Sequence, residues 1–177
     1  MRWRQVASDA VVHNVPTVAE AMAGDTGIEH TRRWERAVGA EQNLDTIKTM
    51  YDAFARGDVE TILGLVTDDV DWSTDAAIVS APWYGPRHGK DEVRGFFEGI
   101  AQAGPVTEFT PLAFASNDDG DVMVFIRYAF TAEATGNSVA MNLHHYWRFR
   151  DGKVCFVRSS EDTAQVAAAL SPSGVTA

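Results

Sequence analysis

The chain has a single cysteine, Cys155, among its 177 residues. One cysteine cannot form an intramolecular disulfide, so we expect a reducing environment and interpret Cys155 as a small hydrophobic residue. Long apolar runs are also missing, since none approaches the ~20 residues that span a membrane. Arg2 and Arg4 precede no apolar segment, which argues against a secretory signal. These absences predict a cytoplasmic protein without a membrane partner.

Basic residues are scarce, with 15 Lys and Arg against 25 Asp and Glu, a net charge of -10 and a pI near 4.8. Phosphate backbones and anionic lipid surfaces repel such a chain, which predicts no nucleic-acid partner. The histidines are not spaced as metal ligands, because His144 and His145 are neighbours in a predicted strand and point to opposite faces. The glycines form no phosphate-binding loop. We therefore expect neither a metal nor another cofactor.

Residues 1–40 differ from the rest of the chain. They contain two capping-box patterns, Thr17–Glu20 and Thr26–Glu29, and their glycines, including Gly39, are expected to divide them into short segments. We interpret this stretch as a partly helical N-terminal extension, either packed on the domain or mobile. A translation start placed too far upstream would give the same composition.

Residues 41–170 are expected to form one domain, followed by a disordered tail over residues 171–177. Helical spacing of apolar residues comes first, in three segments: 44–55, 59–66 and 93–100. Strand-like segments include 70–72 and then, without further helices between them, 106–115, 122–131, 139–150 and 154–160. A capping box at Asp162–Gln165 opens a terminal helix. This order predicts an α+β fold with helices on one face of an antiparallel sheet.

Three stretches in this order resemble the nuclear transport factor 2-like superfamily, in particular its SnoaL-like and ketosteroid isomerase-like domains. They are Ala53–Asp58 with Gly64–Trp72, Gly85–Val93 running into Phe96 and Phe97, and His144–Val154. The resemblance implies a cone-shaped, curved antiparallel sheet wrapped by three N-terminal helices around an apolar pocket. It further implies a small hydrophobic organic molecule as the ligand and a homodimer formed through the convex face of the sheet.

His145 is the first candidate for chemistry. It shares a strand face with Leu143 and Trp147, because alternate residues of a strand point the same way. Aligned through Arg148 and Phe149, it falls where the resemblance places the protonated aspartate of the ketosteroid isomerase oxyanion hole. A neutral imidazole there can donate a hydrogen bond to a developing oxyanion or shuttle a proton. The structural alternative is a histidine that only fills pocket space.

A general base is harder to assign. Where the family often carries its catalytic aspartate, this chain has Thr74, and Asp75 is one residue later. A bulge or an altered loop would be needed to turn Asp75 inward. Glu161 shares a predicted strand face with Ser159 and is the second candidate base, although carboxylates at strand ends usually reach solvent. Both candidates stay open at this point.

Other residues are candidates for substrate binding. The wall of the pocket is expected to include Met50, Tyr51, Trp72, Leu143 and Trp147, although each residue taken alone is better explained as core. Thr74 and Ser159 are expected on the same wall. Trp83 and Tyr84 lie in a loop rich in proline and glycine and are expected at a pocket rim or lid.

Arg127 matches the arginine of the hydrolase members of the superfamily. The aspartates that this arginine would need are replaced by Ala129 and Ser159. Epoxide hydrolysis by that mechanism is therefore excluded.

Two functions remain. In the first, the chain is a cofactor-independent isomerase, cyclase or dehydratase that acts on a hydrophobic carbonyl or polyketide-like compound, with His145 as donor and Asp75 or Glu161 as base. In the second, it is a non-catalytic dimeric ligand-binding or assembly module, which the missing aspartate at Thr74 favours.

Overall fold

The structure is a computed structural model that describes residues 27–76 and 81–171. The chain divides into two compact units, Met1–Glu35 and Arg36–Ala177. Most of the first unit, with most of the predicted extension and the predicted tail, lies outside the described residues. The second unit contains all of the sheet.

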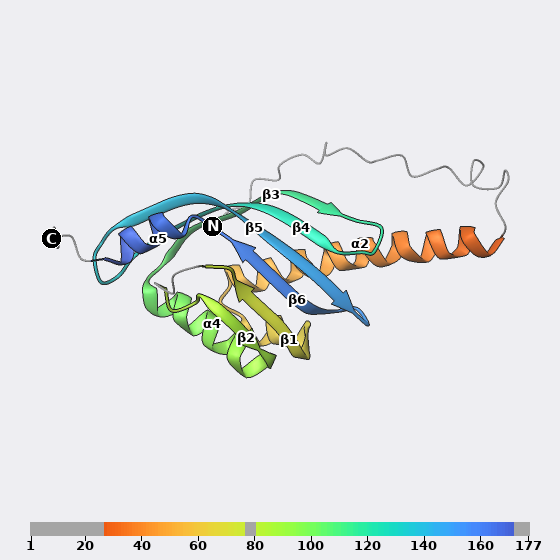
Figure 1. The fold of residues 1–177 in the computed structure, drawn as a ribbon, viewed down its shortest axis with the longest axis horizontal. Coiled ribbons are helices and arrows are strands. Elements are labelled where there is room, and N and C mark those ends of the chain that lie inside the picture. The colour runs from red at the N-terminus through yellow and green to blue at the C-terminus, as the bar shows by residue number, and fades with distance from the viewer. Residues whose placement is uncertain (1–26, 77–80, 172–177) are drawn as a thin grey trace. The chain divides into compact units, whose positions relative to one another are not determined.

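Helices precede most of the sheet, as the α+β expectation requires (Figure 1). They are α2 (Gly27–Ala55), α3 (Val59–Gly64) and α4 (Gly89–Ala103), with α5 (Thr163–Leu170) after the last strand. The predicted break at Gly39 is wrong, because the helix continues through it; one glycine inside a helix costs only about 1 kcal/mol. The side chain of Asp58 caps α3, and that of Asp162 caps α5 as its capping box predicts.

In the described part of the chain, six strands form one sheet in the order β2-β1-β6-β5-β4-β3. Their bounds are β1 (Val66–Thr74), β2 (Gly85–His88), β3 (Val106–Ser116), β4 (Val122–Thr131), β5 (Ser138–Arg150) and β6 (Lys153–Ser160). The sequence pattern does not predict β2, which accommodates Pro86 because it is an edge strand. The pairing of β1 with β6 is parallel, whereas the sequence predicts only antiparallel pairs. No hairpin joins these two strands, so nothing forces them to run in opposite directions.

Irregular pairing bends the sheet. The register shifts twice between β3 and β4, once between β5 and β6 and once between β1 and β6. Such bulges bend a strand and increase its twist, and Figure 1 shows the long strands β3 to β5 curving along their length. The result is a curved, unclosed sheet with helices packed on one face.

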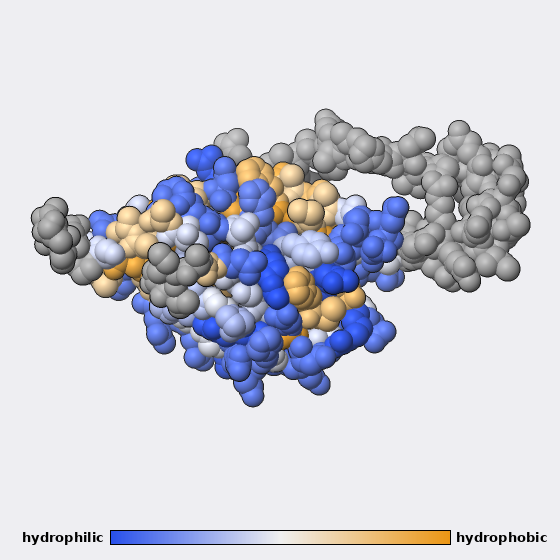
Figure 2. All heavy atoms as spheres, viewed as in Figure 1, coloured by the Kyte–Doolittle hydropathy of each residue, from blue (hydrophilic) through white to orange (hydrophobic). Residues whose placement is uncertain are grey.

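The two faces of the sheet differ in composition. We call the inner face the one that carries Trp72, Leu143, Trp147 and Val157, all of which are buried. The opposite, outer face carries the alternate residues of the same strands, many of them charged or exposed. Figure 2 shows polar side chains over much of the visible surface, with apolar patches between them.

Candidate active site

A pocket lies between the inner face of the sheet and helices α2, α3 and α4. The space between its walls, with the open mouth included, has a volume of about 640 Å³. The centre of a water-sized sphere fits into only about 70 Å³ of this space. Among the residues that the structure describes, eighteen line it, and nine of these are Phe, Tyr or Trp. Only four of these described lining residues are polar beyond the tyrosines and tryptophans: Thr74, His145, Ser159 and Glu161. The pocket is therefore a narrow, mostly aromatic cavity with a few polar groups, which is typical of small-molecule sites.

Ten of the thirteen predicted site residues line this pocket. Seven of them lie on α2 (Met50 and Tyr51), on β1 (Trp72 and Thr74), on β5 (Leu143 and Trp147) and just before β2 (Trp83). The other three are His145, Ser159 and Glu161. Asp75, Tyr84 and Arg127 lie outside its lining. Alternation along the strands explains most of this agreement, because it selects one face of each strand.

Three of the polar residues form a row across the sheet. Thr74 pairs with Ser159 between β1 and β6, and Ser159 pairs with His145 between β6 and β5. Neighbouring strands lie about 4.8 Å apart, so these side chains are close neighbours. The Thr74 Oγ1 and Ser159 Oγ atoms are 2.7 Å apart and both residues are buried. Hydroxyl groups thus occupy the place where the resemblance would put a carboxylate.

His145 is held by a tyrosine from the first helix of the domain. The Tyr51 hydroxyl lies 2.8 Å from His145 Nδ1, and the indole N–H of Trp147 donates to the same hydroxyl at 3.3 Å. Burial, with a smaller effect of His144, lowers the pKa of His145 from 6.5 to about 3. The imidazole is therefore neutral near neutral pH and carries one proton. No described residue forms a hydrogen bond with its Nε2 atom.

Glu161 is the only carboxyl group in the lining of the described part of the pocket. The indole N–H of Trp83 donates to its Oε1 atom at 3.1 Å. Burial raises the pKa of Glu161 above its usual value of 4.5, and the hydrogen bonding only partly offsets this effect. The nearby Tyr84 hydroxyl is buried without a hydrogen bond of normal geometry, and burial also raises its pKa. Glu161 is thus half-buried, whereas carboxylates at strand ends are usually fully solvated.

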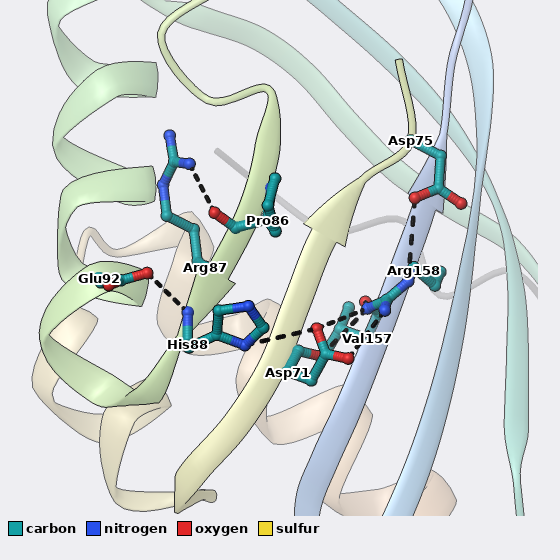
Figure 3. Close-up of polar contacts among 8 residues, drawn as sticks. All are labelled: Asp71, Asp75, Pro86, Arg87, His88, Glu92, Val157 and Arg158. Carbon is teal, nitrogen blue, oxygen red and sulfur yellow. Dashed lines mark hydrogen bonds and ion pairs between the residues drawn. The ribbon is translucent and has the colours of Figure 1, made fainter. Parts of the chain in front are cut away.

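Asp75 lies on the outer side of the sheet, and the hypothesis that it is the pocket base is corrected. Strand β1 pairs in regular register from Asp71 to Thr74, so the inward position goes to Thr74 and the next residue points away. The Asp75 side chain is 68% exposed and lies 3.8 Å from the Arg158 guanidinium (Figure 3). Arg158 also binds Asp71 at 2.8 Å, and its guanidinium stacks over the ring of Phe156.

Arg127 and Tyr84 also differ from their predicted positions. Arg127 lies on the outer face of β4, 60% exposed and 3.4 Å from Glu108, so it is not a substrate-binding residue of this pocket. Trp83 and Tyr84 are 3% and 2% exposed, and the Trp83 ring packs on Phe130. These two residues are core rather than a lid, because burying two large aromatic rings stabilises more than leaving them in a loop.

Tyr128 is a polar lining residue that is not among the predicted site residues. It lies on β4, four residues after Val124, which pairs with His145. Alternation therefore places it on the inner face, a signal that the sequence does contain. Burial, with the charge of Glu161, raises the pKa of Tyr128 well above its usual value, so its hydroxyl stays protonated.

The described residues hold no group of three or more His, Cys, Asp or Glu side chains suited to bind a metal ion. No helix in residues 27–76 or 81–171 is both long and apolar enough to cross a membrane.

Comparison with solved structures gives the same fold. An NTF2-like protein of unknown function from Burkholderia pseudomallei K96243 is 26% identical, with a TM-score of 0.66 over 73% of this chain and 98% of that chain. TerC, crystallised with polyporic acid, is 23% identical, with a TM-score of 0.66 over 73% and 98%. A candidate SnoaL-like polyketide cyclase from Jannaschia sp. CCS1 is 16% identical, with a TM-score of 0.64 over 73% and 92%. The last two likenesses concern the fold alone.

The sequence comparisons give the family. A search of the curated proteins finds no match. Residues 47–157, which include both His145 and the helix segment that carries Tyr51, match the SnoaL-like domain. The chain therefore belongs to the SnoaL-like domain family of the NTF2-like superfamily.

Proposed function

We propose that the chain is a cofactor-independent enzyme that performs acid–base chemistry on a small, neutral aromatic ketone of polyketide-like character. The observation that carries this proposal is the pairing of a neutral His145 with a partly desolvated Glu161 in one aromatic pocket. Isomerisation, cyclisation and dehydration of such compounds all begin with removal of a proton next to a carbonyl group. The candidate cyclase among the structural neighbours is consistent with this class of reaction.

The two groups have complementary roles. An imidazole N–H at Nε2 of His145 donates a hydrogen bond to the ketone oxygen, where negative charge develops. The Glu161 carboxylate takes the proton from the carbon next to the carbonyl. The C–H bond breaks, its electron pair forms the enolate C=C bond, and the π pair of the carbonyl group moves onto the ketone oxygen. A raised pKa makes Glu161 a stronger base than an exposed carboxylate and brings it closer to the operating pH. The hydroxyl groups of Thr74 and Ser159 offer further hydrogen bonds to ligand oxygens.

The charge of the pocket selects against anionic ligands. Its lining contains Glu161 but neither lysine nor arginine among the described residues. A carboxylate or phosphate ligand would lose its hydration without gaining a cationic partner. Nine aromatic lining residues and a narrow cavity favour a flat, uncharged ring system instead.

We expect α-tetralone, a flat aromatic ketone, to bind more tightly than tetralin, which lacks the carbonyl oxygen. One hydrogen bond from His145 is worth about 1–1.5 kcal/mol, or roughly a 5- to 10-fold difference in affinity. Isothermal titration calorimetry measures both affinities, with naphthoate as the anionic ligand expected not to bind. The protein is also expected to accelerate exchange of the tetralone α-protons in deuterated buffer, as followed by NMR.

A matched pair of variants controls this experiment. His145→Ala should abolish the preference for the ketone, whereas His144→Ala, the adjacent exposed histidine on the outer face, should keep it. Equal affinities for ketone and hydrocarbon in the wild type would refute the role of His145. Binding without any acceleration of exchange would support the alternative, a non-catalytic binding module, which the hydroxyl pair at Thr74 favours.

We further propose that the chain forms a homodimer through the outer face of the sheet. Met123 on β4 is 56% exposed and Leu112 on β3 is 52% exposed. Phe125 and Tyr146 share the outer face with Met123, and Figure 2 shows apolar side chains gathered over β3 and β4. An exposed apolar surface of this kind is typical of an interface between protein chains.

Met123→Asp is expected to raise the dimer dissociation constant at least about 10-fold, because a carboxylate replaces apolar surface at the proposed interface. Analytical ultracentrifugation measures the constant, and Gln102→Asp on the exposed side of α4 is the charge-matched control. A wild-type protein that sediments as a monomer at high micromolar concentration would overturn the dimer proposal.

A further inference from the structure

Tyr51 occupies an unusual position for a residue of a pocket wall. It lies on α2 and is 5% exposed, and its hydroxyl contacts two side chains from a single strand, His145 and Trp147. Its ring meets those of His145 and Trp147 at centroid distances of 5.8 and 6.0 Å. Phe109 packs edge-on against the same ring at 5.0 Å. The hydroxyl is thus held in place by packing on several sides.

Counting protons fixes the direction of the hydrogen bonds. The Trp147 indole N–H can only donate, so the Tyr51 oxygen accepts from it. The Tyr51 hydroxyl has one proton, and among the described residues the acceptor within reach is His145 Nδ1, 2.8 Å away. Nδ1 then carries no proton, and the single proton of the neutral imidazole lies on Nε2.

The reverse arrangement leaves a group without a partner. If Nδ1–H donated to Tyr51, the hydroxyl oxygen would accept two hydrogen bonds and its own proton would have no acceptor. A buried donor without a partner costs about 1–3 kcal/mol. The arrangement in which Trp147 donates to Tyr51 and Tyr51 donates to His145 satisfies every polar atom of the three side chains except Nε2.

We propose that Tyr51 is a positioning residue that locks His145 in the tautomer with its proton on Nε2, the atom that the proposed function assigns to the substrate carbonyl. Tyr51 need not touch the substrate to have this effect. Trp147 supports the lock by occupying the hydroxyl oxygen and so directing the hydroxyl proton toward Nδ1. The role of the Nε2 proton toward the substrate rests on the proposed function, whereas the tautomer itself exists without any ligand.

Tyr51→Phe tests this proposal because it removes one hydroxyl group and keeps the ring that packs against Phe109 and Trp147. NMR of the isotope-labelled imidazole nitrogens in the full, ligand-free chain at neutral pH reports which nitrogen is protonated. In the wild type, His145 should show an unprotonated Nδ1 and a protonated Nε2. In Tyr51→Phe, the difference between the two nitrogen signals should shrink as the tautomers mix.

His144 is an internal control in the same spectra, because it lies on the outer face and should be unaffected. A protonated Nδ1 at His145 in the wild type would overturn the proposal, and this result needs no variant to fold. An unchanged tautomer in a folded Tyr51→Phe variant would overturn it as well. If wild-type α-tetralone binding fails while the tautomer shifts as expected, the proposed function is refuted and the positioning role stands.

Ligand preference gives a second readout. Tyr51→Phe should reduce the preference for α-tetralone over tetralin from the expected 5- to 10-fold to about 2- to 5-fold, because mixing of the two tautomers roughly halves the fraction of His145 that can donate from Nε2. Tetralin affinity should stay within about 2-fold of the wild type, because the apolar wall is retained. Loss of affinity for both ligands in equal measure would indicate a structural role and contradict the proposal.

Discussion

Glu161→Gln is expected to slow the protein-catalysed exchange of the α-protons of tetralone by about 10²- to 10⁴-fold, the usual contribution of a general base. Glutamine has nearly the same shape and can still accept the hydrogen bond from Trp83. It cannot accept a proton from carbon, so the substitution removes the proposed chemistry and little else. Exchange rates measured by NMR in deuterated buffer test this prediction.

Asp75→Asn is the matched control, because Asp75 is the other candidate base and lies on the outer side of the sheet. Its exchange rate is expected to match that of the wild type. A large loss of rate in Asp75→Asn, with wild-type rates in Glu161→Gln, would reverse the assignment of the base.

The pH dependence follows from the same residue. Because burial raises the pKa of Glu161, the wild-type exchange rate should fall, as the pH is lowered, at a pH above the usual 4.5 of an exposed glutamate. His145, with a pKa of about 3, stays neutral throughout that range.

The raised pKa of Glu161 also affects stability. The folded protein holds the Glu161 proton to higher pH than the unfolded chain does, so this group favours folding at any pH below its pKa in the unfolded chain. That contribution is lost as the pH rises through the pKa of Glu161 in the folded protein. Glu161→Gln should therefore be more stable than the wild type at neutral pH.

Gly104→Ala is expected to destabilise the fold by about 3 kcal/mol or more, since it combines backbone strain with an overlap of atoms. Gly104 ends α4 with a φ of 137°, a backbone angle that residues with a side chain rarely adopt. A Cβ atom there would lie 2.1 Å from the Thr131 carbonyl oxygen and 2.8 Å from the Glu133 nitrogen. Both are backbone atoms, so neither can rotate away, and the junction between α4 and β3 must shift.

Gly95→Ala is the control for this substitution. Gly95 lies inside α4 with nothing within 4 Å of the position that a methyl group would take, so alanine there should stabilise the helix by about 0.5–1 kcal/mol. Chemical denaturation followed by tryptophan fluorescence measures both variants. A Gly104→Ala protein as stable as the wild type would contradict the close approach of Gly104 to the Thr131 carbonyl group.

Local pattern predicts the secondary structure well where one face of an element is buried. The spacing of Leu143, His145 and Trp147 identifies the inner face of β5 because alternate residues of a strand point the same way. The caps at Asp58 and Asp162 are predictable for a similar reason, since each contacts an amide only three residues away.

Contacts between distant segments could not be predicted in this way. Asp75 points outward because β1 has no bulge at that point, and Arg158, from a strand far along the chain, binds it there. Glu161 accepts a hydrogen bond from the indole N–H of Trp83, which lies 78 residues earlier in the chain. The environment of each carboxyl group depends on strand register, which the sequence pattern does not specify for a parallel pair such as β1 and β6.

The same limit applies to His145. Its place on the inner face follows from alternation, but the partner of its Nδ1 atom is 94 residues away on α2. A tyrosine at the apolar face of a helix reads as core until the helix is docked on the sheet. The tautomer of His145 is therefore a property of the fold rather than of the local sequence.

A crystal structure of the wild-type protein with α-tetralone is the most direct test of the central claim, that this pocket binds a neutral aromatic ketone for acid–base chemistry. We predict the ketone oxygen at hydrogen-bond distance, about 3 Å, from His145 Nε2, with the neighbouring carbon facing the Glu161 carboxyl group. A complex in which the ring lies in the pocket but the ketone oxygen faces away from His145, or in which the ligand lies outside the pocket, would contradict it.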